Sequence, residues 1–146
     1  MKQILCMSSE PWSNRLPGRT QQIISRLRDA QILYFYPAQS TRDRSYLKGV
    51  RQVRPNVAVC ALPPIRFPIP ERRRFFFQMA WNKVGRFIRE NAARHRFTEP
   101  LLWTTHPRHI HLLDQLEYSA LVYDCAPARE GPPPHWEGSL AQAADV

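Results

Sequence analysis

The sequence has little lysine, few acidic residues and no long apolar run. Its 21 basic residues include only three lysines and outnumber the 12 acidic residues, so arginine accounts for the net charge of +9. A membrane-spanning helix needs roughly 18–20 consecutive apolar residues, and no segment approaches that length. The apolar part of the N-terminal MKQILCMS is also too short for the core of a signal peptide. We therefore expect a soluble, cytoplasmic protein that can lie against the inner face of a membrane.

Cysteine is scarce as well. The three cysteines, Cys6, Cys60 and Cys125, form no CxxC pair and lie in or beside apolar runs. This pattern is typical of reduced, buried thiols in the cytosol and gives no indication of zinc binding or redox chemistry.

The chain also has no motif for a nucleotide cofactor. It contains no GxGxxG or Walker sequence and no pattern of an RRM, KH, helix-turn-helix or zinc-finger domain. His106, His109 and His111 are close in sequence, but Pro107 separates the first two and the other two would face different sides of a helix. We therefore expect no cofactor, no metal and no specific nucleic-acid partner. The sequence pI of about 10.2 still indicates an anionic partner, such as nucleic acid, a membrane surface or a phosphorylated substrate.

What the sequence does contain is a regular alternation of apolar strands and helices. Short apolar runs, most of them ended by proline, predict five strands at 3–8, 31–37, 56–63, 99–107 and 119–125. Between and after them, periodic patterns predict helices at 19–29, 71–95, 109–116 and 136–144. Residues 46–53 favour a weak hairpin.

This alternation indicates a three-layer, Rossmann-like α/β domain over residues 1–146, with a mainly parallel sheet. Right-handed crossovers give the strand order 3-2-1-4-5. Ligands of such sheets bind beyond the carboxyl ends of the strands. The fifth strand, LVYDC, therefore delivers Asp124 to the functional edge, where the fourth strand delivers His106.

The helix at 71–95 carries most of the distinctive charge. Phe77, Trp81, Val84 and Ile88 form one apolar face at helical spacing, which is the pattern of a helix that covers a sheet. Its first residues, ERRRFFF, instead combine Arg72, Arg73 and Arg74 with Phe75 and its neighbours. Basic and aromatic residues together suit an anionic membrane interface. The alternative is a solvated basic face.

Four stretches together resemble a known family. WTTHP (103–107), LVYDC (121–125) and LAQAADV (140–146) come in that order, after the loop and helix PWSNRLPGRTQQIISRL (11–27). The chain resembles the N-terminal, acceptor-side domain of family-4-like bacterial glycosyltransferases of the GT-B fold. The resemblance implies transfer of a sugar from a nucleotide-sugar donor to a glycan or polyprenyl-linked acceptor.

Two departures from that family bear on activity. Ala126, Pro127 and Ala128 stand where relatives often have further acidic residues after the Tyr-Asp-Cys sequence. By comparison with that family, we also expect the chain to lack the donor-binding C-terminal domain and to end before the last strand of the N-terminal domain. We therefore expect the isolated chain to be inactive.

The resemblance and the residue chemistry together give candidate site residues. His106 could orient a sugar hydroxyl or act as a general base, or it could cap its strand. Asp124 could accept hydrogen bonds from a sugar hydroxyl, or fix a loop. Gly18 and Arg19 could bind a phosphate at the start of a helix. Trp12 could stack on a sugar or plug the base of its loop.

The leading hypothesis is thus a domain or fragment of a glycosyltransferase. One alternative is a non-catalytic α/β module that binds a membrane or a partner protein through its basic helix. A nucleic-acid binder would fit the charge and the aromatics, but no motif supports it.

Overall fold

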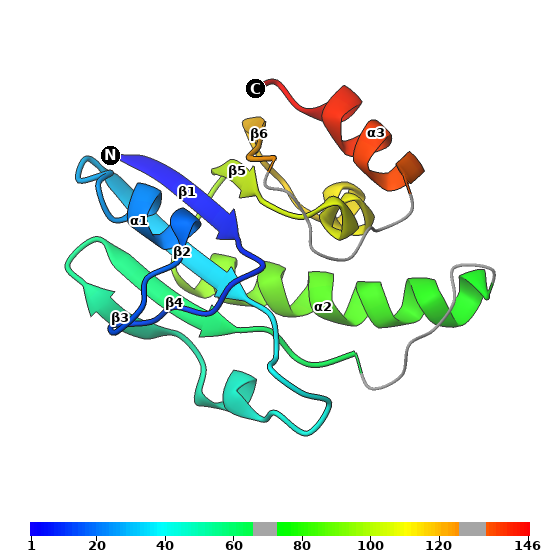
Figure 1. Cartoon of the computed structure of the whole chain (residues 1–146), viewed down its shortest axis with the longest axis horizontal. Helices are drawn as coiled ribbons and strands as arrows, with labels where there is room; N and C mark the ends of the chain where they lie inside the picture. The colour runs from blue at the N-terminus through cyan, green and yellow to red at the C-terminus, as the bar shows by residue number, and fades with distance from the viewer. Residues whose placement is uncertain (66–72, 126–133) are drawn as a thin grey trace.

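The computed structural model describes residues 1–65, 73–125 and 134–146. Its centre is one sheet (Figure 1). The strands are β1 (Lys2–Met7), β2 (Ala30–Tyr36), β3 (Arg51–Arg54), β4 (Val57–Ala61), β5 (Leu101–Thr104) and β6 (Ala120–Tyr123). They lie in the order β3-β4-β2-β1-β5-β6. All neighbouring pairs are parallel except β3 with β4. The predicted order of the five apolar strands is therefore confirmed, with β1 in the interior of the sheet.

The antiparallel edge strand β3 completes a mixed sheet. Residues 46–53 were expected to form a weak hairpin of their own, but they contribute to two different elements. Ser45–Lys48 form a 3₁₀-helix, η1, and β3 follows it and pairs with β4. The turn between β3 and β4 is fixed by Asn56, whose side-chain amide donates to the carbonyls of Leu27 (2.8 Å) and Ala30 (2.9 Å).

The helices are α1 (Arg19–Ile24), α2 (Arg74–Arg94), η2 (Pro107–Gln115), which is a 3₁₀-helix, and α3 (Pro134–Ala143). The first is shorter than the predicted helix at 19–29. Beyond Ile24 the chain tightens into 3₁₀-type turns, in which Arg26 and Leu27 donate to the carbonyls three residues before them. Among the described helices, none combines the length and the apolar character that crossing a lipid bilayer demands.

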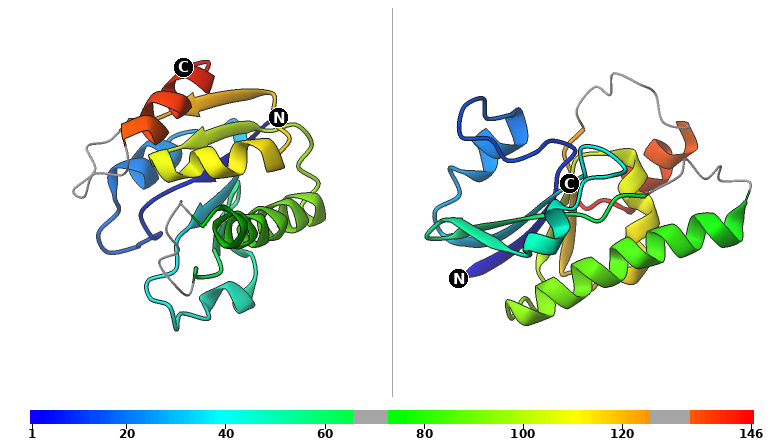
Figure 2. Two further views of the ribbon diagram at one scale, coloured as in Figure 1. Left: turned by 90° about the vertical axis from the view of Figure 1, so that its right-hand side faces the viewer. Right: turned by 90° about the horizontal axis from the view of Figure 1, so that it is seen from below.

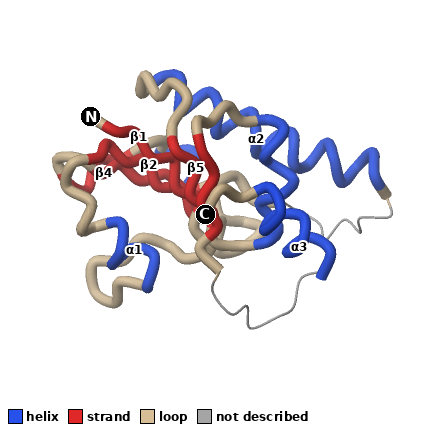
Figure 3. The backbone as a smooth tube through the Cα atoms, turned by 90° about the horizontal axis from the view of Figure 1, so that it is seen from above, coloured by secondary structure: helices blue, strands red, loops and turns tan. Residues whose placement is uncertain are grey.

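Helices cover both faces of the sheet. Figure 2 and Figure 3 show α2 and α1 on opposite sides of the strands. The side chains of β1 alternate accordingly: Leu5 and Met7 pack in the cluster that contains α2, η2 and α3, whereas Ile4 and Cys6 pack in the cluster that contains Ile24 of α1. This is the period-two pattern of a strand buried on both faces.

The apolar stripe of α2 is core, as predicted. Trp81, Val84 and Ile88 are buried against the sheet, and Phe77 is half-buried beside them. The basic residues on the opposite side, Lys83, Arg86 and Arg89, are all exposed.

After α3, the last residues pair with β6. The amide of Asp145 donates to the carbonyl of Leu121, and the amide of Tyr123 donates to the carbonyl of Val146, each at 2.8 Å. These bonds extend the hydrogen-bond ladder beyond β6.

Candidate functional site at the carboxyl edge of the sheet

The carboxyl ends of the five parallel strands meet at one edge of the sheet. From β1 the chain passes to β2 on one side, and it later reaches β5 on the other side of β1. The position between β1 and β5 is therefore the topological switch point, where ligands of open α/β sheets bind.

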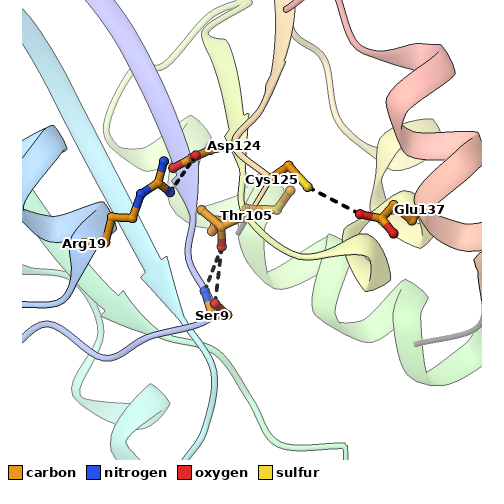
Figure 4. A network of polar contacts seen from close by, with 7 residues as sticks. Ser9, Arg19, Thr105, Asp124, Cys125 and Glu137 are labelled. Atoms are coloured by element: carbon orange, nitrogen blue, oxygen red, sulfur yellow. Dashed lines mark hydrogen bonds and ion pairs between the residues drawn. The ribbon is translucent and has the colours of Figure 1, made fainter. Parts of the chain in front are cut away.

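Thr105 joins the two strands that flank this switch point. Its Oγ1 accepts a hydrogen bond from the amide of Ser9 (3.0 Å) and lies 3.5 Å from the hydroxyl of Ser9 (Figure 4). The same hydroxyl is within 3.4 Å of the carbonyl of Met7. Thr105 is buried. No sequence pattern singles out Thr105, although it directly precedes His106 in WTTHP.

Asp124 lies at the expected edge and is paired with Arg19. A guanidinium nitrogen of Arg19 donates to Oδ1 of Asp124 at 2.7 Å (Figure 4). The Asp124 amide donates to the carbonyl of Thr104 (2.9 Å), which fixes the backbone beside β5. Oδ2 of Asp124 is buried and accepts no hydrogen bond from the residues that the structure describes. One carboxylate oxygen is thus held by the ion pair while the other keeps its hydrogen-bonding capacity.

The start of α1 does not present a free anion site. Gly18 precedes the helix with a φ of −70°, so the backbone conformation there does not require glycine. A Cβ at this position would instead collide with the carboxylate of Glu10. The space beside Gly18 is therefore filled by the carboxylate of Glu10. The neighbouring Arg19 forms an ion pair with Asp124.

Trp12 packs within the protein. Its ring meets Tyr34 edge-to-face, with centroids 5.2 Å apart, and the guanidinium carbon of Arg54 lies 6.0 Å from the centre of the indole. Trp12 is half-buried. These contacts match a residue that plugs the base of its loop.

His106 caps the start of η2. Its Nδ1 accepts hydrogen bonds from the backbone amide (3.1 Å) and from Nε (3.2 Å) of Arg108. Burial, and then the charge of Arg108, lower the pKa of His106 to about 4. The ring is therefore neutral at neutral pH, and because Nδ1 is an acceptor, its proton lies on Nε2. In this state His106 is a hydrogen-bond donor to a ligand, and it would act as a base through Nδ1 only after releasing Arg108.

A cavity of about 300 Å³ opens at the same edge, on the α2 side of the sheet. The loops after β1, β2 and β4 line it together with α2 and η2. Its polar lining residues are Ser8, Ser9, Ser40, Thr41, Arg108 and His109. Neither His106 nor Asp124 is among the described residues that line it. The cavity could not be predicted from the sequence because its walls come from segments far apart in the chain.

His109 is a deeply buried polar residue of this cavity. The residue is 4% exposed, and its Nδ1 has no hydrogen-bond partner among the described residues. Burial, followed by the charges of Arg108 and His106, lowers the pKa of His109 to about 3, so the ring is neutral.

No metal centre is formed by the part of the chain that the structure describes, where no three His, Cys, Asp or Glu side chains converge. His111 instead lies among aromatic rings. Its ring centroid is 4.7 Å from that of Phe77, 5.3 Å from Trp81 and 4.6 Å from Trp136.

The basic end of α2 is exposed. Arg72 lies outside the described residues, whereas Arg73 and Arg74 are exposed at the start of the helix. Phe75 is 70% exposed and Phe76 55% exposed, and their rings meet edge-to-face at 5.5 Å. In Figure 1 this end of α2 extends beyond the strands of the sheet. The structure thus places cationic and aromatic groups side by side in solvent.

Comparison with known proteins gives no identification. No protein-family model matches the chain, and no curated protein matches it.

Proposed function

We propose that the chain is the acceptor-side domain of a glycosyltransferase of the GT-B fold, which transfers a sugar from a nucleotide-sugar donor to a glycan or lipid-linked acceptor. The observation that supports the proposal is that stretches far apart in the sequence meet at the carboxyl edge of the sheet. WTTHP ends after β5, LVYDC ends after β6, and Arg19 from the loop and helix at 11–27 bonds Asp124. Three of the stretches that carry the resemblance therefore meet at the edge where such sheets bind ligands.

The proposed roles follow from the geometry of the side chains. Oδ2 of Asp124 accepts a hydrogen bond from an acceptor hydroxyl, while Arg19 holds the other oxygen in place. His106 donates from Nε2 to a second oxygen of the sugar. A departing nucleoside diphosphate would be stabilised by a second, donor-binding domain, which the GT-B resemblance implies.

Saturation-transfer NMR with a panel of bacterial glycans tests this proposal. We expect saturation of at least one glycan, and at least tenfold weaker binding by Asp124→Asn and His106→Gln. Asp114→Asn serves as the control because Asp114 is an exposed carboxylate on η2. If no glycan is saturated, or if Asp114→Asn weakens binding as much as Asp124→Asn, the proposal is wrong.

The exposed end of α2 favours a second function, binding to an anionic membrane surface. Phe75 and Phe76 offer rings to the lipid interface beside Arg73 and Arg74. This function would bring the domain to a lipid-linked acceptor, or it would act alone in a non-catalytic membrane-binding module. Glycan binding distinguishes the two, since the module would bind liposomes without binding any glycan.

A further inference from the structure

We infer that the cavity between η2 and the loops after β1, β2 and β4 is a binding site for a small organic oxyanion, a phosphate or carboxylate on a compact, partly apolar molecule. Arg108 would hold the charged group. The site is separate from Asp124 and does not depend on sugar transfer.

The shape of the cavity suits such a ligand. Its volume of about 300 Å³ lies at the lower end of small-molecule sites, which run from roughly 300 to 1,000 Å³. Trp81, Val84 and Leu112 form an apolar wall, and Ser40 and Thr41 bring hydroxyl groups. This combination fits a molecule with an apolar body and one polar group.

The charge in the cavity is positive and uncompensated. No acidic residue is among the described residues that line it, and the one ion pair within the described parts of the chain joins Arg19 to Asp124. The Arg108 residue is exposed, and the atoms that cover the rest of its side chain lower its pKa from the ordinary value. Because no carboxylate among the described residues pairs with it, this guanidinium is available to form charge-assisted hydrogen bonds with a bound anion.

The guanidinium is also oriented. Nε of Arg108 donates to Nδ1 of His106 at 3.2 Å, which leaves the two terminal nitrogens for a ligand. These nitrogens present parallel N–H groups that match the two oxygens of a carboxylate or phosphate. In this arrangement His106 is a positioning residue for Arg108.

His109 supplies an independent observation. A buried nitrogen without a partner is rare in proteins, because leaving it unpaired costs free energy. Nδ1 of His109 is such an atom among the described residues, and His109 lines the cavity. A hydrogen bond with a ligand oxygen would satisfy this nitrogen, which donates or accepts according to the tautomer of the His109 ring.

The test uses probes that carry no sugar: phenyl phosphate, benzoate and the neutral analogue benzyl alcohol, titrated into the whole chain and followed by amide NMR. We expect at least one anion to bind tenfold or more tightly than benzyl alcohol. The shifts should centre on Ser9, Thr41 and Arg108. The preferred anion identifies the ligand as a phosphate or a carboxylate.

Variants then assign the contacts. Arg108→Gln should weaken anion binding at least tenfold, and Arg108→Lys should weaken it less, since it keeps the charge without the planar fork. The control is Arg86→Gln, an exposed arginine of α2 outside the cavity lining, which should bind within twofold of the wild type. If Arg108→Gln does not fold, Arg108→Lys and His109→Asn carry the test. Equal binding of the neutral and anionic probes, or unchanged binding by the folded variants, would overturn the inference while leaving the glycan experiment unaffected.

Discussion

A guanidinium nitrogen of Arg19 lies 2.7 Å from Oδ1 of Asp124, although 105 residues separate the two in sequence. The contact links the start of α1 to the end of β6. The Arg19 side chain is 57% exposed and that of Asp124 is 10% exposed, so water screens the pair from one side. Its main consequence is therefore the fixed position of the carboxylate.

Removing Arg19 should change stability little. We expect Arg19→Ala to lower the free energy of unfolding by about 0.2–1 kcal/mol, the range of exposed ion pairs, as measured by urea denaturation. A loss above about 2 kcal/mol would show that the pair holds the fold together. In the glycan experiment the same variant should weaken binding, because Asp124 is then free to turn away.

His109 of η2 and His106, which caps this helix, should make the protein less stable in acid. The pKa values of His106 and His109 fall from 6.5 to about 4 and about 3 in the folded state, so between those values the unfolded chain binds more protons than the folded chain. Their contribution to stability is present above about pH 6.5 and is lost as the pH falls toward 4 and then 3. Urea denaturation from pH 7 to pH 4 measures this loss, and His109→Asn should reduce the slope. An unchanged slope in His106→Gln and His109→Asn would contradict the two lowered pKa values.

Thr105 should matter more for stability than its size suggests. In Thr105→Val the amide of Ser9 loses its acceptor in a partly buried position, which costs about 1–3 kcal/mol. Thr105→Ser keeps the hydroxyl and should lose less. Thermal denaturation of both variants measures the difference, and a loss in Thr105→Ser as large as that in Thr105→Val would contradict a dominant role of the hydroxyl.

Binding to anionic liposomes should depend on the start of α2. A basic residue near an anionic surface contributes about 1 kcal/mol, so Arg73→Gln combined with Arg74→Gln should weaken co-sedimentation roughly thirtyfold. Phe75→Ser should also weaken it without unfolding the protein, since Phe75 is exposed. The matched control replaces Arg86 and Arg89, which are exposed farther along the same helix.

Competition with RNA separates the membrane from nucleic acid as the partner. High salt weakens either kind of binding, because the Debye length falls from ~10 Å at 0.1 M to ~3 Å at 1 M. RNA should compete poorly if Phe75 and Phe76 enter the lipid interface. Equally little sedimentation with neutral and anionic liposomes would leave α2 as a helix that covers the sheet and has a solvated basic end.

The strand order can be predicted from the sequence because each parallel strand is a distinct apolar run and crossover connections are right-handed. The pattern favours only a weak hairpin at 46–53 and does not define β3, whose Arg51, Gln52 and Arg54 are exposed and show no strand-like alternation of apolar residues. It also overextended α1, since the pattern of apolar positions does not distinguish an α-helix that ends at Ile24 from one that continues as 3₁₀ turns.

From the sequence, only the location of the site at the carboxyl edge of the sheet could be predicted. The proline-terminated strands place His106 and Asp124 after neighbouring strands, and the structure agrees with that placement. The partners of these residues could not be foreseen, because the Arg19–Asp124 pair and the contact of Glu10 with Gly18 depend on how loops fold back over the sheet. The cavity around Arg108 depends on loops from three strands in the same way.

The antiparallel strand β3 also bears on how the protein avoids aggregation. It covers the backbone edge of β4, the fully buried apolar segment VAVCA, which would otherwise offer unpaired amides and carbonyls to another chain. The strand that takes the outer position is short, has an irregular register between Gln52 and Arg54, and exposes two arginines. Two copies that approached through this edge would bring like charges together before any hydrogen bond formed between them. The positive charge of β3 therefore disfavours the addition of a second molecule at this edge of the sheet.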